Sequence, residues 1–170
     1  RPEIGRWQIC RFLNLDNSEV SLGGHSLLDS TQDNGLCVQS ESFDFLLDMD
    51  NQHPKVLPGQ VYVPVCYRAR YELNTGDTMG IGGEELTIAG FLRDAQMNSM
   101  MASSKRFLVS KWDYGRLKAG GEEEYLIEFL LKDGADINDL STAYTDQGLP
   151  ANGPAITKPL IRMMNALSDG

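Results

Sequence analysis

The sequence has little positive charge, no long apolar run and no leader segment. It holds 15 Lys and Arg against 24 Asp and Glu, a net charge of −9, whereas nucleic-acid binding and docking on an anionic bilayer both depend on clustered cations. Charged residues interrupt every apolar stretch before it reaches the roughly 18 residues of a membrane-spanning helix. The chain opens on Arg-Pro-Glu, without an initiator Met or a secretory leader. We therefore expect a soluble domain that binds no nucleic acid and is a piece of a longer protein.

Cysteine and histidine are also scarce. Cys10, Cys37 and Cys66 are odd in number and widely spaced, so the chain has no self-contained disulfide framework. One bridge plus a free thiol remains open as an alternative, but we favour three reduced, buried cysteines. The only histidines, His25 and His53, stand in no zinc-binding spacing. We expect neither a metal nor a cofactor.

No motif for catalysis or nucleotide binding is present. Residues 80–83, Gly-Ile-Gly-Gly, lack the Lys-Ser or Lys-Thr of a phosphate-binding loop and precede a predicted strand, so we interpret them as a hairpin turn. Residues 103–105, Ser-Ser-Lys, miss the Ser-x-x-Lys spacing, and no Gly-x-Ser-x-Gly elbow occurs. We therefore expect that the chain is not an enzyme.

The first third of the chain alternates turn signals with short strands. Apolar residues alternate imperfectly over residues 6–15, which predicts a strand, and Asp-Asn-Gly at 33–35 indicates a tight turn into a second strand at 36–38. The uniformly apolar residues 43–49 favour a short helix capped by Ser42.

The middle and last thirds differ in pattern. The middle predicts a hairpin-rich region: strands at 60–65, 79–81 and 85–92, and a short helix at 67–73, with Pro64 at a strand end or sheet edge. The last third alternates strands at 106–110, 125–131 and 155–157 with helices at 111–119, 136–145 and 158–167, a pattern typical of βαβ units.

These patterns together predict an α+β domain with two lobes. The first lobe is β-rich and covers about residues 58–105. The second is α/β and covers about residues 106–170 together with part of residues 1–57.

A methionine-rich segment lies between two predicted strands, at residues 93–106. Its methionines either fold back onto the core or form an adaptable contact surface, because thioethers repack readily against varied partners. The candidate contact residues are Arg93, Met97, Asn98, Met100, Met101 and Lys105.

The order of three middle segments is similar to that of a known family. They are residues 59–65 (GQVYVPV), 73–78 (LNTGDT) and 86–92 (LTIAGFL). In this order they resemble the extracytoplasmic domain of FtsX/MacB-type ABC-transporter permeases. Residues 93–99, 103–109, 125–129 and 152–157 extend the likeness over most of residues 58–170.

The resemblance implies a single extracytoplasmic domain, similar to the MacB periplasmic core, with a β-rich lobe and a βαβ porter-like lobe. Such a domain is inserted between two membrane helices of the parent permease, so both chain ends return to the membrane. ATP hydrolysis then belongs to a separate cytoplasmic ATPase subunit, and ATP binding closes a permease dimer. The partner or substrate outside the membrane is a peptide, a lipid or a protein.

A second hypothesis comes from a different class of protein. A free-standing extracellular hydrolase or carbohydrate-binding module would hold His25 or His53 in a deep pocket with converging carboxylates. The positions of the two histidines therefore bear on this alternative.

Overall fold

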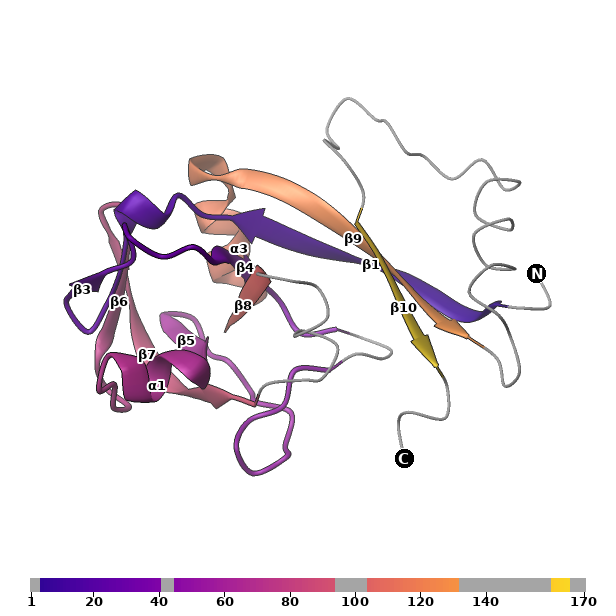
Figure 1. Ribbon diagram of the computed structural model, residues 1–170, viewed down its shortest axis with the longest axis horizontal. Coiled ribbons are helices and arrows are strands. Elements are labelled where there is room, and N and C mark those ends of the chain that lie inside the picture. The colour runs from indigo at the N-terminus through magenta and orange to yellow at the C-terminus, as the bar shows by residue number, and fades with distance from the viewer. Residues whose placement is uncertain (1–3, 41–44, 94–103, 132–159, 166–170) are drawn as a thin grey trace. The chain divides into compact units, whose positions relative to one another are not determined.

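The computed structural model describes residues 4–40, 45–93, 104–131 and 160–165 and is shown in Figure 1. The described chain is a mixed α+β structure, rich in strand, with a few short helices. Its elements are β1 (Ile4–Asn14), η1 (Asn17–Glu19), β2 (Val20–Leu22), β3 (His25–Ser26), β4 (Asp33–Cys37), β5 (Gln60–Pro64), α1 (Cys66–Arg70), β6 (Thr78–Ile81), β7 (Glu84–Leu92), β8 (Ser104–Val109), α3 (Lys111–Leu117), η2 (Lys118–Gly120), β9 (Glu122–Leu131) and β10 (Leu160–Asn165).

The chain divides into two compact units. One holds residues 1–11 and 124–170, and the other holds residues 12–123. We call them the terminal unit and the inserted unit. Their limits differ from the lobe limits expected from the sequence, near residues 58 and 105, and the lobes stay a prediction.

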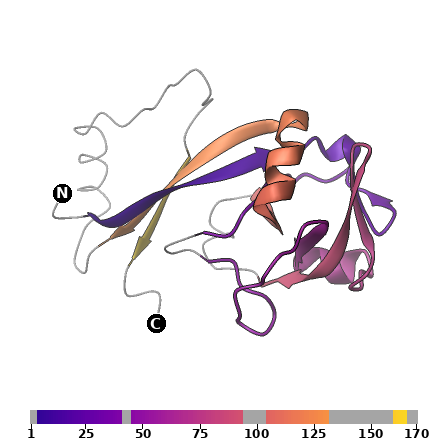
Figure 2. The same cartoon turned by 180° about the vertical axis from the view of Figure 1, so that it is seen from behind.

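The inserted unit is built on a mixed sheet in the strand order β1-β4-β8-β5-β7-β6-β2-β3. The pairs β4–β8 and β5–β7 are parallel, whereas the β6–β7 pair forms the predicted antiparallel hairpin. α1 lies towards the viewer in Figure 1, and α3 lies towards the viewer in the opposite view of Figure 2. Side chains from the sheet and from both helices form a core, which includes Leu13, Leu36, Val61, Phe107 and Tyr114.

The terminal unit contributes three strands in the order β10-β9-β1. β10 runs parallel to β9, in register from Leu160 opposite Leu126 to Asn165 opposite Leu131. In this unit Ile127 is buried, and the Arg11 guanidinium lies 5.7 Å from the centre of the Tyr125 ring.

Most predicted elements are confirmed within a few residues. These are the strands expected at 6–15, 36–38, 60–65, 79–81, 85–92, 106–110 and 125–131 and the helices expected at 67–73 and 111–119. For Pro64 the sequence left two alternatives, the end of a strand or the edge of the sheet. The first is correct, because Pro64 is the last residue of β5 and β5 lies between β8 and β7.

The turn predicted at residues 33–35 is wrong, because these residues belong to β4. Gly35 faces the Phe12 ring so closely that a Cβ atom at this position would lie 2.2 Å from a ring carbon. Asn34 is fully buried. The residues that indicate a turn are therefore used here for a close ring contact and for a buried hydrogen-bond network.

Two predicted helices are also wrong. Of the helix expected at 43–49, the described residues 45–49 are not helical. The Gln39 side chain holds Leu46 through both its N–H and its C=O, at 2.9 and 2.8 Å, and thereby takes up the groups that a helix would use. Of the helix expected at 158–167, residues 160–165 form β10, because pairing with β9 outweighs an ambiguous apolar run. The helix expected at 136–145 and the strand expected at 155–157 lie outside the described residues.

A buried polar network ties α1 to the first strands of the inserted unit. The Tyr67 hydroxyl donates to Asn34 Oδ1 at 2.5 Å. Asn34 Nδ2 donates to Asn17 Oδ1 at 2.8 Å, and Asn17 Nδ2 donates to the Gln32 carbonyl at 2.9 Å. Burial raises the pKa of Tyr67 to about 12. The network therefore favours the neutral phenol, which can donate this hydrogen bond.

We expect Tyr67→Phe to lower the free energy of unfolding by about 1–3 kcal/mol, because it leaves Asn34 Oδ1 buried without this donor. Urea unfolding at neutral pH measures this change. Since the pKa of Tyr67 is higher in the folded chain, its contribution is complete below about pH 10 and is lost as the pH rises towards 12. Tyr71→Phe is the matched control. Equal stability of the Tyr67 and Tyr71 variants would contradict the role of the network.

A second network attaches α3 to the start of β5. Asp113 is 2% exposed, and its Oδ2 accepts from the Gly59 N–H at 2.8 Å and from Ser110 Oγ at 3.0 Å. Arg116 donates to Asp113 Oδ1 at 3.1 Å and to Glu84 Oε2 at 2.7 Å. Ser110 in turn caps the helix by accepting from the Asp113 N–H. The Asp113 carboxylate also raises the pKa of Arg116.

We expect Asp113→Ala to lower the free energy of unfolding by about 3 kcal/mol. The substitution leaves the Gly59 N–H without its acceptor and removes the buried partner of Arg116. Glu84→Gln is the control. Its side chain is 56% exposed, so its loss should cost less than about 1 kcal/mol. Denaturant unfolding of both variants checks the prediction, which fails if their costs are similar.

Candidate functional site

The structure describes two of the six predicted contact residues. The exposed Arg93 donates its main-chain N–H to the Leu47 carbonyl at 2.9 Å and its guanidinium to Asn51 Oδ1. Lys105 is half-buried on β8, opposite Asn34 of β4. Met97, Asn98, Met100 and Met101 lie outside the described residues. The contact surface on this segment therefore stays a prediction.

The two histidines lie on separate exposed segments. His25 is on β3 and stacks on Tyr71, with ring centres 5.5 Å apart. His53 stacks on Phe45 at 4.3 Å. Within the part of the chain that the structure describes, no group of three or more His, Cys, Asp or Glu side chains is placed to hold a metal ion.

The cysteines differ in environment, and the expectation that all three are buried is wrong. Cys37 is buried on β4, where it packs with Leu46, Leu92 and Leu108. Cys10 on β1 is half-buried, and Cys66 is exposed at the start of α1. A helix of five residues with one buried side chain leaves its other positions in solvent, which the sequence pattern did not reveal.

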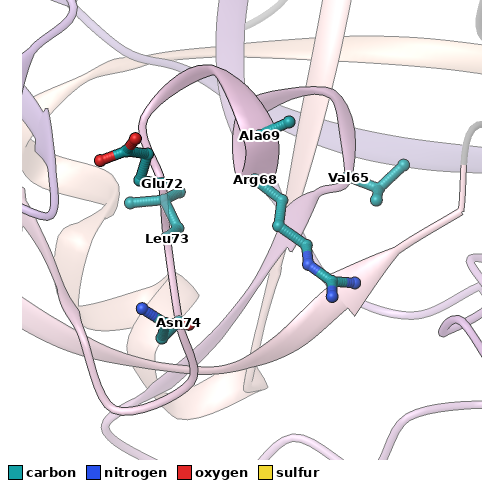
Figure 3. Close-up of a pocket in the computed structure, with 6 residues that line it drawn as sticks. All are labelled: Val65, Arg68, Ala69, Glu72, Leu73 and Asn74. Atoms are coloured by element: carbon teal, nitrogen blue, oxygen red, sulfur yellow. The ribbon is translucent and has the colours of Figure 1, made fainter.

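An open pocket lies beside α1 and has a volume of about 440 Å³ (Figure 3). Neither histidine lines it, and of the predicted contact residues that the structure describes, neither Arg93 nor Lys105 does. The lining combines apolar and polar side chains from α1, from the residue before it and from the turn after it: Val65, Arg68, Ala69, Glu72, Leu73 and Asn74. We call this the α1 pocket.

The end of α1 shapes one wall of the pocket. The Leu73 N–H donates to the Arg68 carbonyl at 2.9 Å, and the Glu72 N–H donates to the Ala69 carbonyl at 3.4 Å. Glu72 has a φ of 53°, in the left-handed region. This is the Schellman arrangement, in which the left-handed position usually belongs to Gly. The sequence carries no Gly there, so its pattern gave no signal for this helix end.

The turn after the helix fixes the part of the pocket that Asn74 lines. Asp77 Oδ2 accepts from the Asn74 N–H at 2.8 Å. The Gly76 N–H donates to the Ile88 carbonyl, and the Ile88 N–H donates to the Asp77 carbonyl, both at 2.8 Å. Gly76 has a φ of 97°, which a residue with a side chain adopts only with strain. The Gly-Asp turn therefore maintains the fold and fixes Asn74 beside the pocket.

Two arginines lie on α1, on a chain of net charge −9. The Arg68 guanidinium lies over the Phe91 ring, 5.4 Å from its centre, and the Arg70 guanidinium lies over Tyr71 at the same distance. Among the ion pairs that the described residues form, none involves Arg68. The pocket thus presents an oriented cation next to an apolar surface, which suits the binding of a carboxylate.

We expect Glu72→Gly to raise the free energy of unfolding by about 0.5–1 kcal/mol, because glycine adopts the left-handed conformation without steric cost. Glu72→Ala removes the same carboxylate but keeps a Cβ atom, so it should give no gain. Thermal unfolding of the two variants separates backbone strain from side-chain effects. A gain in both variants would attribute it to the lost charge instead.

Comparisons of the chain with models of protein families, with curated proteins and with solved structures gave no match. No helix in the described ranges is both long and apolar enough to cross a membrane.

Proposed function

We propose that the chain is the extracytoplasmic domain of an FtsX/MacB-type ABC-transporter permease. In this role it couples cytoplasmic ATP-driven motion to the export or release of a substrate, or to a partner outside the membrane. The observation that carries the proposal is that residues 12–123 form a unit inserted into the unit of residues 1–11 and 124–170. This arrangement suits a domain placed between two membrane helices, because both chain ends then belong to one unit that can follow those helices.

The two strands that link the units supply a mechanical connection. β1 contributes residues 4–11 to the terminal unit and its last residues to the inserted unit, where Leu13 pairs with Leu36 of β4. β9 begins in the inserted unit and continues into the terminal unit, where six of its residues pair with β10. A movement of the terminal unit would thus reach the inserted unit without any catalytic step in this chain.

Four of the segments that resemble the permease family lie in the inserted unit. They form β5, the turn at residues 73–78, β7 and β8. In the sheet, β8 neighbours β5 and β5 neighbours β7. Four of the similar segments therefore belong to one region of the sheet, whereas residues 125–129 lie on β9 in the terminal unit. This supports the finer fold that we propose, a MacB-periplasmic-core-like domain with a β-rich lobe and a βαβ porter-like lobe.

The proposal includes the partners of the domain. These are the transmembrane helices of the parent permease, a second permease copy and a separate cytoplasmic ATPase subunit. On the outer side the domain meets a peptide, lipid or protein, and the segment between Arg93 and Lys105 is the predicted contact.

Labelling of the full-length protein in intact cells tests the location. We expect Thr75→Cys, in a Cys66→Ser background, to react with a membrane-impermeant maleimide, because Thr75 is exposed in the turn after α1. Val61→Cys is the control for accessibility, since Val61 is 0% exposed. It should stay unlabelled before and after permeabilisation.

Labelling of Thr75→Cys only after permeabilisation would refute the extracytoplasmic location. Purification of the full-length protein in mild detergent gives a second readout. An ATPase subunit should copurify, and its absence from a preparation that retains the folded domain would argue against a permease.

A further inference from the structure

We infer that the α1 pocket binds a peptide segment of a partner protein through one acidic side chain flanked by apolar residues. In this mode Arg68 pairs with the carboxylate, and the apolar lining of the pocket contacts the neighbouring side chains. The inference concerns the pocket itself and holds whether or not the chain belongs to a permease.

The fold keeps Glu72, the carboxylate nearest to Arg68 in the sequence, away from it. Glu72 follows Arg68 by four residues, the spacing at which opposite charges pair along a helix. However, α1 ends at Arg70, and the left-handed backbone of Glu72 redirects its side chain. Figure 3 shows the two charged groups pointing to opposite sides of the pocket. In the part of the chain that the structure describes, Arg68 therefore has no carboxylate partner, and its guanidinium can receive one from another molecule.

Arg68 is also held in a suitable orientation. Its guanidinium lies 5.4 Å from the centre of the Phe91 ring, and Phe91 is only 7% exposed. Stacking on a fixed ring restricts the arginine side chain before a ligand arrives, which lowers the entropy lost on binding. A guanidinium in a fixed plane can receive both oxygens of a carboxylate.

The rest of the lining suits a chain segment better than a small free acid. Val65 and Ala69 supply most of the apolar surface, because Leu73 is only 3% exposed. The Asn74 side-chain amide can both donate to and accept from a peptide main chain. Arg68, Ala69, Glu72 and Asn74 are all exposed, so the pocket is open. Small-molecule sites enclose most of their ligand. An extended peptide that lies across the opening can instead gain affinity from the residues that precede and follow its acidic side chain.

The charge of the protein limits the number of acidic groups in the ligand. At a net charge of −9, additional carboxylates beyond the reach of Arg68 would be repelled. The Glu72 carboxylate lies on the far side of the same pocket and adds to this repulsion. The favoured ligand therefore carries one acidic residue at the position of Arg68, with apolar residues beside it.

Titration of the isotope-labelled chain with two blocked tripeptides tests the inference by nuclear magnetic resonance. The probes are acetyl-Leu-Asp-Leu-amide and acetyl-Leu-Asn-Leu-amide, which differ in charge but hardly in shape. At millimolar concentrations we expect the aspartate peptide to shift amide resonances of residues 65–74 and to bind about fivefold more tightly than the asparagine peptide. This factor is what an exposed ion pair contributes.

Arg68→Gln should abolish the preference for the aspartate peptide, whereas Arg70→Gln on the same helix should keep it. Thermal unfolding of both variants verifies that they remain folded. Sodium acetate should bind at least tenfold more weakly than the aspartate peptide, because it lacks the apolar and main-chain contacts. Equal binding of the two peptides, shifts away from residues 65–74, or equally tight binding of acetate would overturn the inference.

Discussion

The hydrogen bond from Tyr67 to Asn34 is the contact on which the arrangement of the inserted unit depends. α1 has only five residues, and a helix this short is not stable by itself in water. Tyr67 is its one buried side chain, stacked between Phe107 and Tyr71 and bonded to a buried amide. This single residue therefore determines where α1 lies against β4 and β8 and, with it, where the α1 pocket forms.

The position of α1 has consequences for the surface beside it. Because the helix ends at Arg70, Glu72 takes up a left-handed backbone and Leu73 enters the core. Arg68 consequently has Phe91 below it instead of a carboxylate from its own helix. A helix one turn longer would place Glu72 next to Arg68 and would neutralise both. The chemistry of the pocket thus follows from where the helix ends.

One unit is inserted into the sequence of the other, between residues 11 and 124. The chain enters the inserted unit after residue 11 and leaves it after residue 123, and at both points it lies within or next to a strand, β1 or β9. Within the inserted unit, the Asp113 carboxylate on α3 accepts a hydrogen bond from the Gly59 N–H, next to the first residue of β5.

The amino-acid sequence alone predicted most strands, both described helices of the inserted unit and the β6–β7 hairpin, because short-range periodicity and turn residues specify these elements. It predicted neither the α1 pocket nor the place of Arg68 over Phe91. It also misassigned Gly35 to a turn and residues 160–165 to a helix. Those features depend on contacts between distant segments: a ring above a glycine, a neighbouring strand, and a phenol that reaches a buried amide. The sequence determined the local elements, and only the tertiary structure decided which residues share a surface, because that requires distant segments of the chain to pack against one another.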